Sequence, residues 1–364
     1  MRGIKMAKRT ATMTNRERLA ALLRGEKPDR VPIWPISLGF YTVYYGKTIG
    51  EAYTNAELFT ECLRNACQEL DWIFFPLGAA LTNLASEFGG EIKWPSSGYS
   101  QAPMVVRFPA ETPEEVMNLK MPDIKTAGTN PMRMAHAAAA LNEKNDNCLF
   151  NKMLWLGGPF TSACNLAGVE KTCKWMLKKP DVVHRMMRLS TDYYLELAKM
   201  HKATYGTEGA LAFYPEPASS NQIISAKQFE EFALPYLIEV HKAVLNLGYK
   251  NIFVHICGEQ NANLPLWTKI PFGNPGILSF GHEVDLEKAN EYFPEHIIEG
   301  NLEPAIIQTA TPEQVYKAAA EVVKKGKKMK GGFIFSPGCE LPPNSPKENI
   351  KAMNQAVDDF GWYD

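Results

Sequence analysis

Two side chains that can bind a metal, His255 and Cys257, stand at the end of an apolar run that spans residues 251–258 and closes with a glycine. The run predicts a buried strand, and side chains two positions apart on a strand point to the same side. The imidazole and the thiol therefore project together from the carboxyl end of the strand. This spacing indicates two ligands of one metal ion.

A third ligand is available in Cys339, which follows a second apolar run and the segment Ser-Pro-Gly. Zinc prefers nitrogen and sulfur ligands, and a catalytic zinc site takes about three of them from the protein while one position stays open. His255, Cys257 and Cys339 make such a set. For each cysteine taken singly, the alternative is a small core residue without chemistry. The His-x-Cys spacing favours the metal.

The composition excludes several classes of partner. The 364 residues carry 39 Lys and Arg against 40 Asp and Glu, a formal net charge of -1, so nucleic acid is not expected as a partner. Seven cysteines without paired spacing, and no recognisable signal peptide, indicate a reducing, cytoplasmic location. No apolar stretch approaches the roughly 20 residues that cross a bilayer, so no membrane partner is expected.

The elements that must position these ligands alternate regularly. Apolar runs predict strands at residues 29–34, 71–76, 148–156, 210–214, 251–257, 277–281, 296–300 and 332–335. Helix patterns fall at about residues 55–69, 131–144, 225–247, 285–293, 312–325 and 346–360, and two further helices meet at Pro180. Such alternation implies parallel strands joined by right-handed crossovers, and about eight units close an α/β barrel of the (β/α)8 TIM type.

The barrel is expected to be one domain, at residues 14–364. Residues 1–13 are basic and aperiodic, which predicts a disordered extension. The segments 87–94 and 104–108 predict short strands of an excursion from the barrel. Neither a linker nor a shift in composition divides the remainder.

The active site of such a barrel lies at the carboxyl ends of its strands. Besides the three metal ligands, Glu216, His282 and Asn301 follow predicted strands. Glu216 is a candidate fourth metal ligand or catalytic base, with a surface carboxylate held by two prolines as the alternative. His282 and Asn301 are candidates for cofactor or ligand contacts, and the alternative for each is a cap on the next helix.

An aromatic segment follows the first predicted strand, at residues 37–46, and contains Phe40 and Tyr41. A loop of this composition is suited to cover a flat apolar ligand. Plain packing of the rings is the alternative.

Together these residues resemble the uroporphyrinogen decarboxylase superfamily from Arg16 to the last helix. The resemblance is carried by the opening Arg-x-x-Ala-Leu-Leu-Arg-Gly-Glu-x-x-Asp-Arg-Val-Pro, by Gly-Pro-Phe-Thr161, by Gly-Asn-Leu-Glu-Pro304 and by the closing Glu348-Asn349. The His-x-Cys and the late Ser-Pro-Gly-Cys look like its corrinoid-dependent methyltransferase branch, of the methylcobamide:coenzyme M methyltransferase type. The chain departs from the decarboxylases, because no arginine occurs between Arg30 and Arg64 to clamp substrate carboxylates.

The resemblance implies a barrel with zinc bound by His255, Cys257 and Cys339, and a methyl group that moves between a corrinoid and a small molecule. A thiol bound to zinc loses its proton and stays nucleophilic. The Asp-x-His-x-x-Gly pattern of cobalamin domains is absent. A separate corrinoid protein carrying methylcobalamin is therefore implied, docked near Phe40 and Tyr41, and a homodimer is a further expectation.

Alternative functions remain open at this point. The enzyme could instead demethylate a methoxylated or methylamine-type compound onto the corrinoid, although two cysteine ligands favour a thiol acceptor. A porphyrinogen carboxy-lyase lacks its arginines here. A non-catalytic barrel stabilised by zinc would need a fourth fixed ligand, and no fourth cysteine lies near these strand ends.

Overall fold

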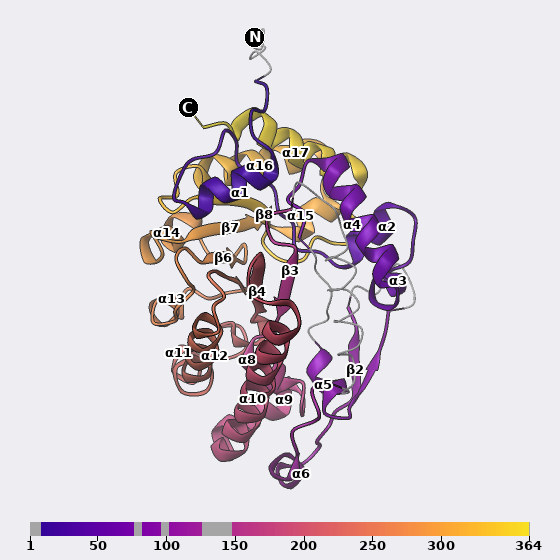
Figure 1. The fold of residues 1–364 in the computed structure, drawn as a ribbon, viewed down its shortest axis with the longest axis vertical. Helices are drawn as coiled ribbons and strands as arrows, with labels where there is room; N and C mark the ends of the chain where they lie inside the picture. Colours follow the sequence, from indigo (N-terminus) through magenta and orange to yellow (C-terminus); the bar gives the residue numbers. More distant parts are fainter. Residues whose placement is uncertain (1–8, 76–81, 96–101, 126–147, 364) are drawn as a thin grey trace.

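A parallel sheet in the middle of the molecule carries the candidate ligands (Figure 1). The computed structural model describes residues 9–75, 82–95, 102–125 and 148–363. Neighbouring strands of the sheet follow the chain order β3-β4-β5-β6-β7-β8, and every pair is parallel. The strands are β3 (Lys152–Trp155), β4 (Ala210–Pro215), β5 (Ile252–Ile256), β6 (Ile277–Phe280), β7 (Ile297–Leu302) and β8 (Phe333–Pro337).

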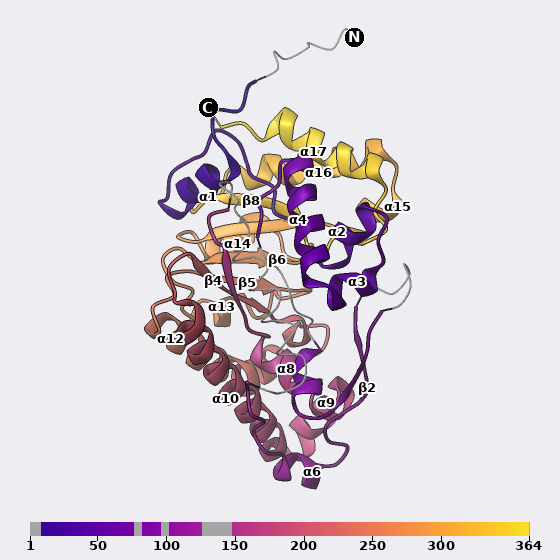
Figure 2. The ribbon, with the colours of Figure 1, turned by 45° about the vertical axis from the view of Figure 1, so that its right-hand side comes forward.

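Helices pack beside the first strands of the sheet and beside the last ones. In Figures 1 and 2, α16 and α17 lie beside the β7–β8 end, whereas α10 and α12 lie beside the β3–β4 end. The described helices are α1 (Asn15–Leu23), α2 (Gly39–Tyr44), α3 (Ile49–Thr54), α4 (Ala56–Leu70), α5 (Asn83–Glu87), α6 (Pro113–Asn118), α8 (Pro159–Cys164), α9 (Val169–Lys178), α10 (Pro180–Tyr205), α11 (Ala226–Gln228), α12 (Leu234–Asn246), α13 (Leu264–Trp267), α14 (Leu286–Tyr292), α15 (Pro304–Thr309), α16 (Pro312–Gly326) and α17 (Lys347–Phe360).

Two further segments extend the sheet beyond β8. Ile33 forms a parallel bridge with Phe335, and the Ile73 amide donates to the Ile33 carbonyl at 2.9 Å. On the far side, the Cys148 thiol, just before β3, contacts the Phe74 carbonyl at 3.9 Å. Residues 29–34 and 71–75 thus occupy the positions of the first two predicted strands, although in the described residues no ladder of backbone hydrogen bonds joins residues 73–75 to β3.

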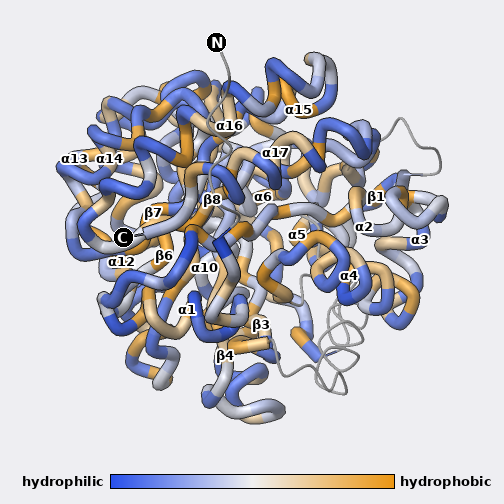
Figure 3. Tube along the Cα trace, turned by 90° about the horizontal axis from the view of Figure 1, so that it is seen from above, coloured by the Kyte–Doolittle hydropathy of each residue, from blue (hydrophilic) through white to orange (hydrophobic). Residues whose placement is uncertain are grey.

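The core follows from the apolar composition of the strands. Every residue of β4 to β8 is buried, and the exposed turns of the outer helices are more polar (Figure 3). Trp34 fills part of the interior, with ring centroids 5.2 Å from Phe75 and 5.0 Å from Phe253. Large buried rings contribute most of the burial energy of such a core.

Most predicted elements are confirmed, with two changes among the helical regions. The aromatic segment 37–46 contains a helix, α2, rather than an open loop. The predicted helix 225–247 begins with a capping box at Ser225, but a π turn, η2 (Phe229–Ala233), separates α11 from α12. The excursion forms an antiparallel pair, β1 (Glu91–Lys93) with β2 (Met104–Arg107).

Two predictions concern segments that lie wholly or partly outside the described residues. The helix expected at 131–144 lies outside the described residues. Of the expected extension 1–13, residues 9–13 are described, and the Thr12 and Met13 amides donate to Asp29 Oδ2 at 2.8 and 3.0 Å. These bonds attach the end of the segment to the fold. None of the helices in the described ranges meets the length and hydropathy that a membrane crossing requires.

Candidate metal centre

The three predicted metal ligands meet at the carboxyl ends of β5 and β8. His255 is the fourth residue of β5, Cys257 follows the strand, and Cys339 follows β8 by two residues. One ligand atom from each residue lies within 4.8 Å of the others. Among the His, Cys, Asp and Glu side chains of the described residues, these three form the group whose spacing could hold a metal ion.

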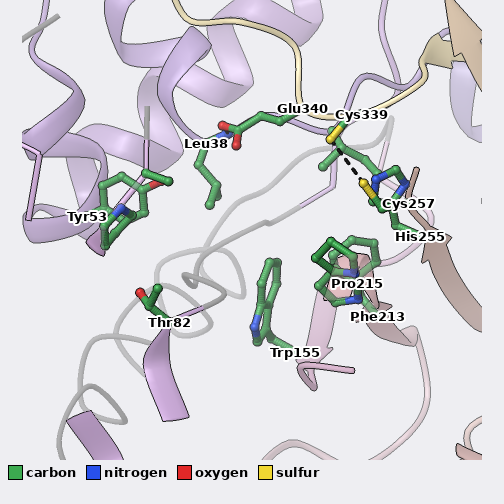
Figure 4. Close-up of a pocket in the computed structure, with 14 residues that line it drawn as sticks. Leu38, Tyr53, Thr82, Trp155, Phe213, Pro215, His255, Cys257, Cys339 and Glu340 are labelled. Carbon is green, nitrogen blue, oxygen red and sulfur yellow. Dashed lines mark hydrogen bonds between the residues drawn. The ribbon is translucent and has the colours of Figure 1, made fainter. Parts of the chain in front are cut away.

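The separation of the two sulfurs distinguishes a metal site from a disulfide. Cys257 Sγ and Cys339 Sγ are 3.6 Å apart (Figure 4). A disulfide would need about 2.05 Å. Two sulfurs bound to one tetrahedral zinc at about 2.3 Å would lie about 3.8 Å apart, so the observed distance fits a shared ion.

The protonation of the cluster suits a cation. The hydrogen bond between the two sulfurs lowers the pKa of the Cys339 thiol and raises that of Cys257. One proton is thus shared in the hydrogen bond between the two sulfurs. Burial lowers the pKa of His255, but the adjacent Cys339 sulfur and its negative charge outweigh burial, and the net direction is upward. A cation that replaces the shared proton would relieve the crowding of negative charge.

A row of polar side chains across β5, β6 and β7 orients the imidazole. His255, Ser279 and Glu299 are register neighbours, and His255 Nδ1 lies 2.9 Å from Ser279 Oγ. His255 Nε2 is buried without a hydrogen-bond partner among the described residues, which leaves it free for a metal. Burial raises the pKa of Glu299 to about 7. The sequence pattern did not lead us to predict Ser279 and Glu299 as site residues, although each is a single polar residue inside an apolar run.

Glu216 does not join this cluster. The Phe160 amide donates to its carboxylate at 3.1 Å, the Thr161 amide at 2.7 Å, and the Thr161 hydroxyl also donates to it. The side chain is fully buried rather than on the surface, and burial raises its pKa to about 7. To become a ligand, Glu216 would have to release these bonds at the start of α8.

Phe40 and Tyr41 pack inside the fold. Both are buried in α2, where Phe40 packs against Trp72 with centroids 5.8 Å apart, and the Tyr41 hydroxyl donates to the Pro35 carbonyl. The aromatic segment became a helix because its rings pack onto α4 and the segment after it. Packing, the alternative stated for these rings, therefore describes them better than a cofactor contact.

His282 and Asn301 have different environments. The Asn301 amide donates to the carbonyls of Gly281 and Val284 at 3.0 and 2.7 Å, so it fixes the loop after β6. His282 is partly exposed, with Nδ1 3.5 Å from Glu283 Oε2. Neither side chain is among the described residues that line the cavity beside the cluster.

The three ligands line one wall of a cavity of about 240 Å³. Its other described walls are mostly apolar, and Figure 4 shows Trp155, Phe213 and Pro215 below the two sulfurs. Glu340, which sequence reasoning missed, also lines it, and its carboxylate accepts from the Leu38 amide at 3.0 Å. Burial raises the pKa of Glu340 to about 7. The sequence feature that could have indicated Glu340 as a site residue is its position directly after Cys339.

Comparison with known proteins gives matches over nearly the whole chain. The family model described as "Uroporphyrinogen decarboxylase (URO-D)" matches residues 14–360. A methylated-thiol–coenzyme M methyltransferase of Methanosarcina mazei is 28% identical over 55% of this chain, and the alignment spans 51% of that relative. A methylcobamide:CoM methyltransferase of Methanosarcina acetivorans is 25% identical over 96% of this chain and 99% of the relative.

Decarboxylases and a solved structure match as well. A uroporphyrinogen decarboxylase of Coxiella burnetii is 25% identical over 94% of this chain and 94% of the relative. The solved structure of a methyltransferase from Methanosarcina mazei is 22% identical, covers 96% of this chain and 99% of its own, and superimposes with a TM-score of 0.79. The last comparison shows that the fold is shared.

Proposed function

Since the chain belongs to the uroporphyrinogen decarboxylase family, whose members include both decarboxylases and corrinoid methyltransferases, we propose that it is a zinc-dependent methyltransferase. It transfers a methyl group between a corrinoid held by a separate protein and a small thiol. The observation that carries the proposal is the approach of His255, Cys257 and Cys339 to within 4.8 Å at the wall of a cavity.

The decarboxylase alternative has less support from the same cavity. Carboxylates of a porphyrinogen need cationic partners. The described residues that line the cavity include neither lysine nor arginine. The donor set of one nitrogen and two sulfurs instead fits zinc, and relatives named as methylcobamide:CoM methyltransferases support methyl transfer.

The residues of this chain have separable roles in the transfer. His255 would bind zinc through Nε2 while Ser279 holds Nδ1, and Cys257 and Cys339 would bind as thiolates. Bound zinc would supply the positive charge that lets a substrate thiol lose its proton near neutral pH. In such a transfer, a substrate thiolate would form a bond to the methyl carbon of the corrinoid donor while the carbon–cobalt bond breaks and its electron pair stays on cobalt. The apolar walls exclude water from the nucleophile.

Metal analysis tests the proposal. Wild-type protein purified without chelator should contain about one zinc per chain, as measured by mass spectrometry, because three preorganised ligands hold the ion. Cys257→Ala and Cys339→Ala should each lose it. Cys173→Ala, which removes a half-buried thiol on α9, is the matched control and should keep it.

A second measurement tests the reaction itself. Zinc-loaded wild type should demethylate methylcobalamin in the presence of thiols, and Cys257→Ala and Cys339→Ala should not. A wild type that contains no zinc, or that transfers no methyl group to any thiol, would contradict the proposal.

A further inference from the structure

We propose that the cavity beside the three ligands takes a neutral, largely apolar molecule of the size of one substituted benzene ring. Its reactive sulfur lies at the metal end, and an uncharged hydrogen-bonding group lies at the other. This inference rests on the proposed function and names the substrate class of the same site.

The walls of the cavity favour a flat ring. Trp155 and Phe213 form one side, with ring centroids 5.1 Å apart, and both are buried. The remaining apolar lining is aliphatic: Ile36, Leu38, Ala102, Pro103, Pro215 and Pro217. Aromatic faces and proline rings offer extended contact to a planar ligand and few polar partners.

The volume sets the size of the ligand. An apolar cavity of about 150 Å³ accommodates benzene, with its six carbon atoms. By proportion, the cavity here, about 240 Å³, holds roughly ten non-hydrogen atoms. That is a benzene ring with a sulfur and one small substituent.

The charges of the described lining residues favour an uncharged substrate over an anionic one. The described lining residues contain neither lysine nor arginine, whereas the Glu340 carboxyl group faces the same space. A sulfonate or carboxylate placed there would lose its hydration without gaining a cationic partner. An uncharged substituent does not have this cost.

The two ends of the cavity differ in chemistry. Figure 4 shows the sulfurs of Cys257 and Cys339 on one side of Trp155, and Thr82 and Tyr53 on the other. Thr82 Oγ1 is buried and has no hydrogen-bond partner among the described residues. Buried hydroxyls are nearly always satisfied, so a polar group of a ligand is the natural partner for this one.

Two thiols of equal size test the inference. 4-Mercaptobenzamide and 4-mercaptobenzoate differ only in that the second is an anion at neutral pH. Calorimetry on the zinc-loaded protein should show at least tenfold tighter binding of the amide. Equal or tighter binding of the carboxylate would overturn the inference. So would a clear preference for 2-mercaptoethanesulfonate, a small anionic thiol.

A variant of Thr82, at the end of the cavity away from the sulfurs, distinguishes a hydrogen bond to the ligand from an effect on packing. Thr82→Val should weaken binding of 4-mercaptobenzamide about fivefold, as expected for one hydrogen bond, and leave thiophenol binding unchanged. Thr60→Val, which removes a hydroxyl bonded to Ala56 on α4, is the control and should affect neither ligand. Equal weakening of both ligands in Thr82→Val would argue against a role of Thr82 in recognition.

Failure of this inference differs from failure of the proposed function. Tight amide binding without methyl transfer from methylcobalamin would refute the methyltransferase proposal and support the neutral-ligand site. Methyl transfer to 4-mercaptobenzoate and 4-mercaptobenzamide with equal efficiency would support the methyltransferase proposal and refute the neutral-ligand site.

Discussion

At the scale of single residues, the orientation of His255 is what suits the cluster to a metal ion. Ser279 Oγ lies 2.9 Å from His255 Nδ1, so the ring cannot turn freely. The other ring nitrogen, Nε2, is buried without a hydrogen-bond partner among the described residues and is available to a metal ion. Ligating histidines usually hold their second nitrogen in this way, and loss of the outer partner weakens metal binding. Ser279 is therefore a positioning residue.

We expect Ser279→Ala to lower zinc affinity by about 10- to 100-fold, because the imidazole loses its fixed orientation. Competition with a chromophoric chelator measures this. Ser190→Ala is a matched control, since that hydroxyl is also buried and donates to the Pro159 carbonyl, away from the metal centre. Unchanged affinity in Ser279→Ala would assign the serine to packing alone.

At the scale of elements, two helices are tied to neighbouring segments through buried, neutral histidines. On α10, His201 Nδ1 lies 2.7 Å from the Tyr249 hydroxyl, and on α12, His241 Nδ1 lies 2.9 Å from the Pro271 carbonyl. Burial lowers the pKa of each histidine from 6.5 to about 4. Both helices therefore depend on imidazoles that stay uncharged.

The sign of the pH dependence follows from these shifts. The unfolded chain binds a proton at each histidine below pH 6.5, whereas the folded chain does so only below about pH 4. Their contribution is thus complete above pH 6.5 and is lost as the pH falls toward 4. Each histidine should therefore subtract about 2 kcal/mol from the free energy of unfolding between pH 7 and pH 5. The buried carboxyl groups of Glu216, Glu299 and Glu340, whose pKa values are raised, act in the opposite direction, so the effect of each histidine is measured as the difference between variant and wild type in urea unfolding. His201→Gln and His241→Gln should each gain about 2 kcal/mol relative to wild type from pH 7 to pH 5; a difference that stays constant with pH in both variants would contradict the assignment.

At the scale of the whole molecule, the candidate metal centre lies between distant parts of the sheet. Cys257 and Cys339 are 82 positions apart in the chain, and β6 and β7 lie between the strands that carry them. An ion bound to both would join β5 to the segment after β8. A ligand that binds only the folded state stabilises it in proportion to RT ln(1 + [L]/Kd).

Chelation should therefore lower the melting temperature of the zinc-loaded wild type by about 5 °C, given roughly 4 kcal/mol of linkage for a thousandfold excess over Kd. Scanning calorimetry with and without chelator provides the measurement. Cys257→Ala and Cys339→Ala should melt at temperatures that the chelator does not change. An equal chelator effect on these variants would mean that it acts elsewhere.

Much of the molecule could be predicted from the sequence because the responsible interactions are local. Capping boxes form at Thr14, Thr112 and Ser225, and each depends on residues only three positions apart. Strand periodicity placed the polar residues at carboxyl ends, and residue chemistry selected His255, Cys257 and Cys339, which the structure brings together.

Tertiary structure decided what depends on contacts between distant segments. The carboxylate of Glu216 accepts hydrogen bonds from residues of α8, and Phe40 is buried against Trp72; neither contact could be predicted from the sequence. Ser279 and Glu299 align with His255 only through the register of three parallel strands. Register and helix packing are set by the whole core rather than by any single segment, which is why the sequence alone named the ligands but not their surroundings.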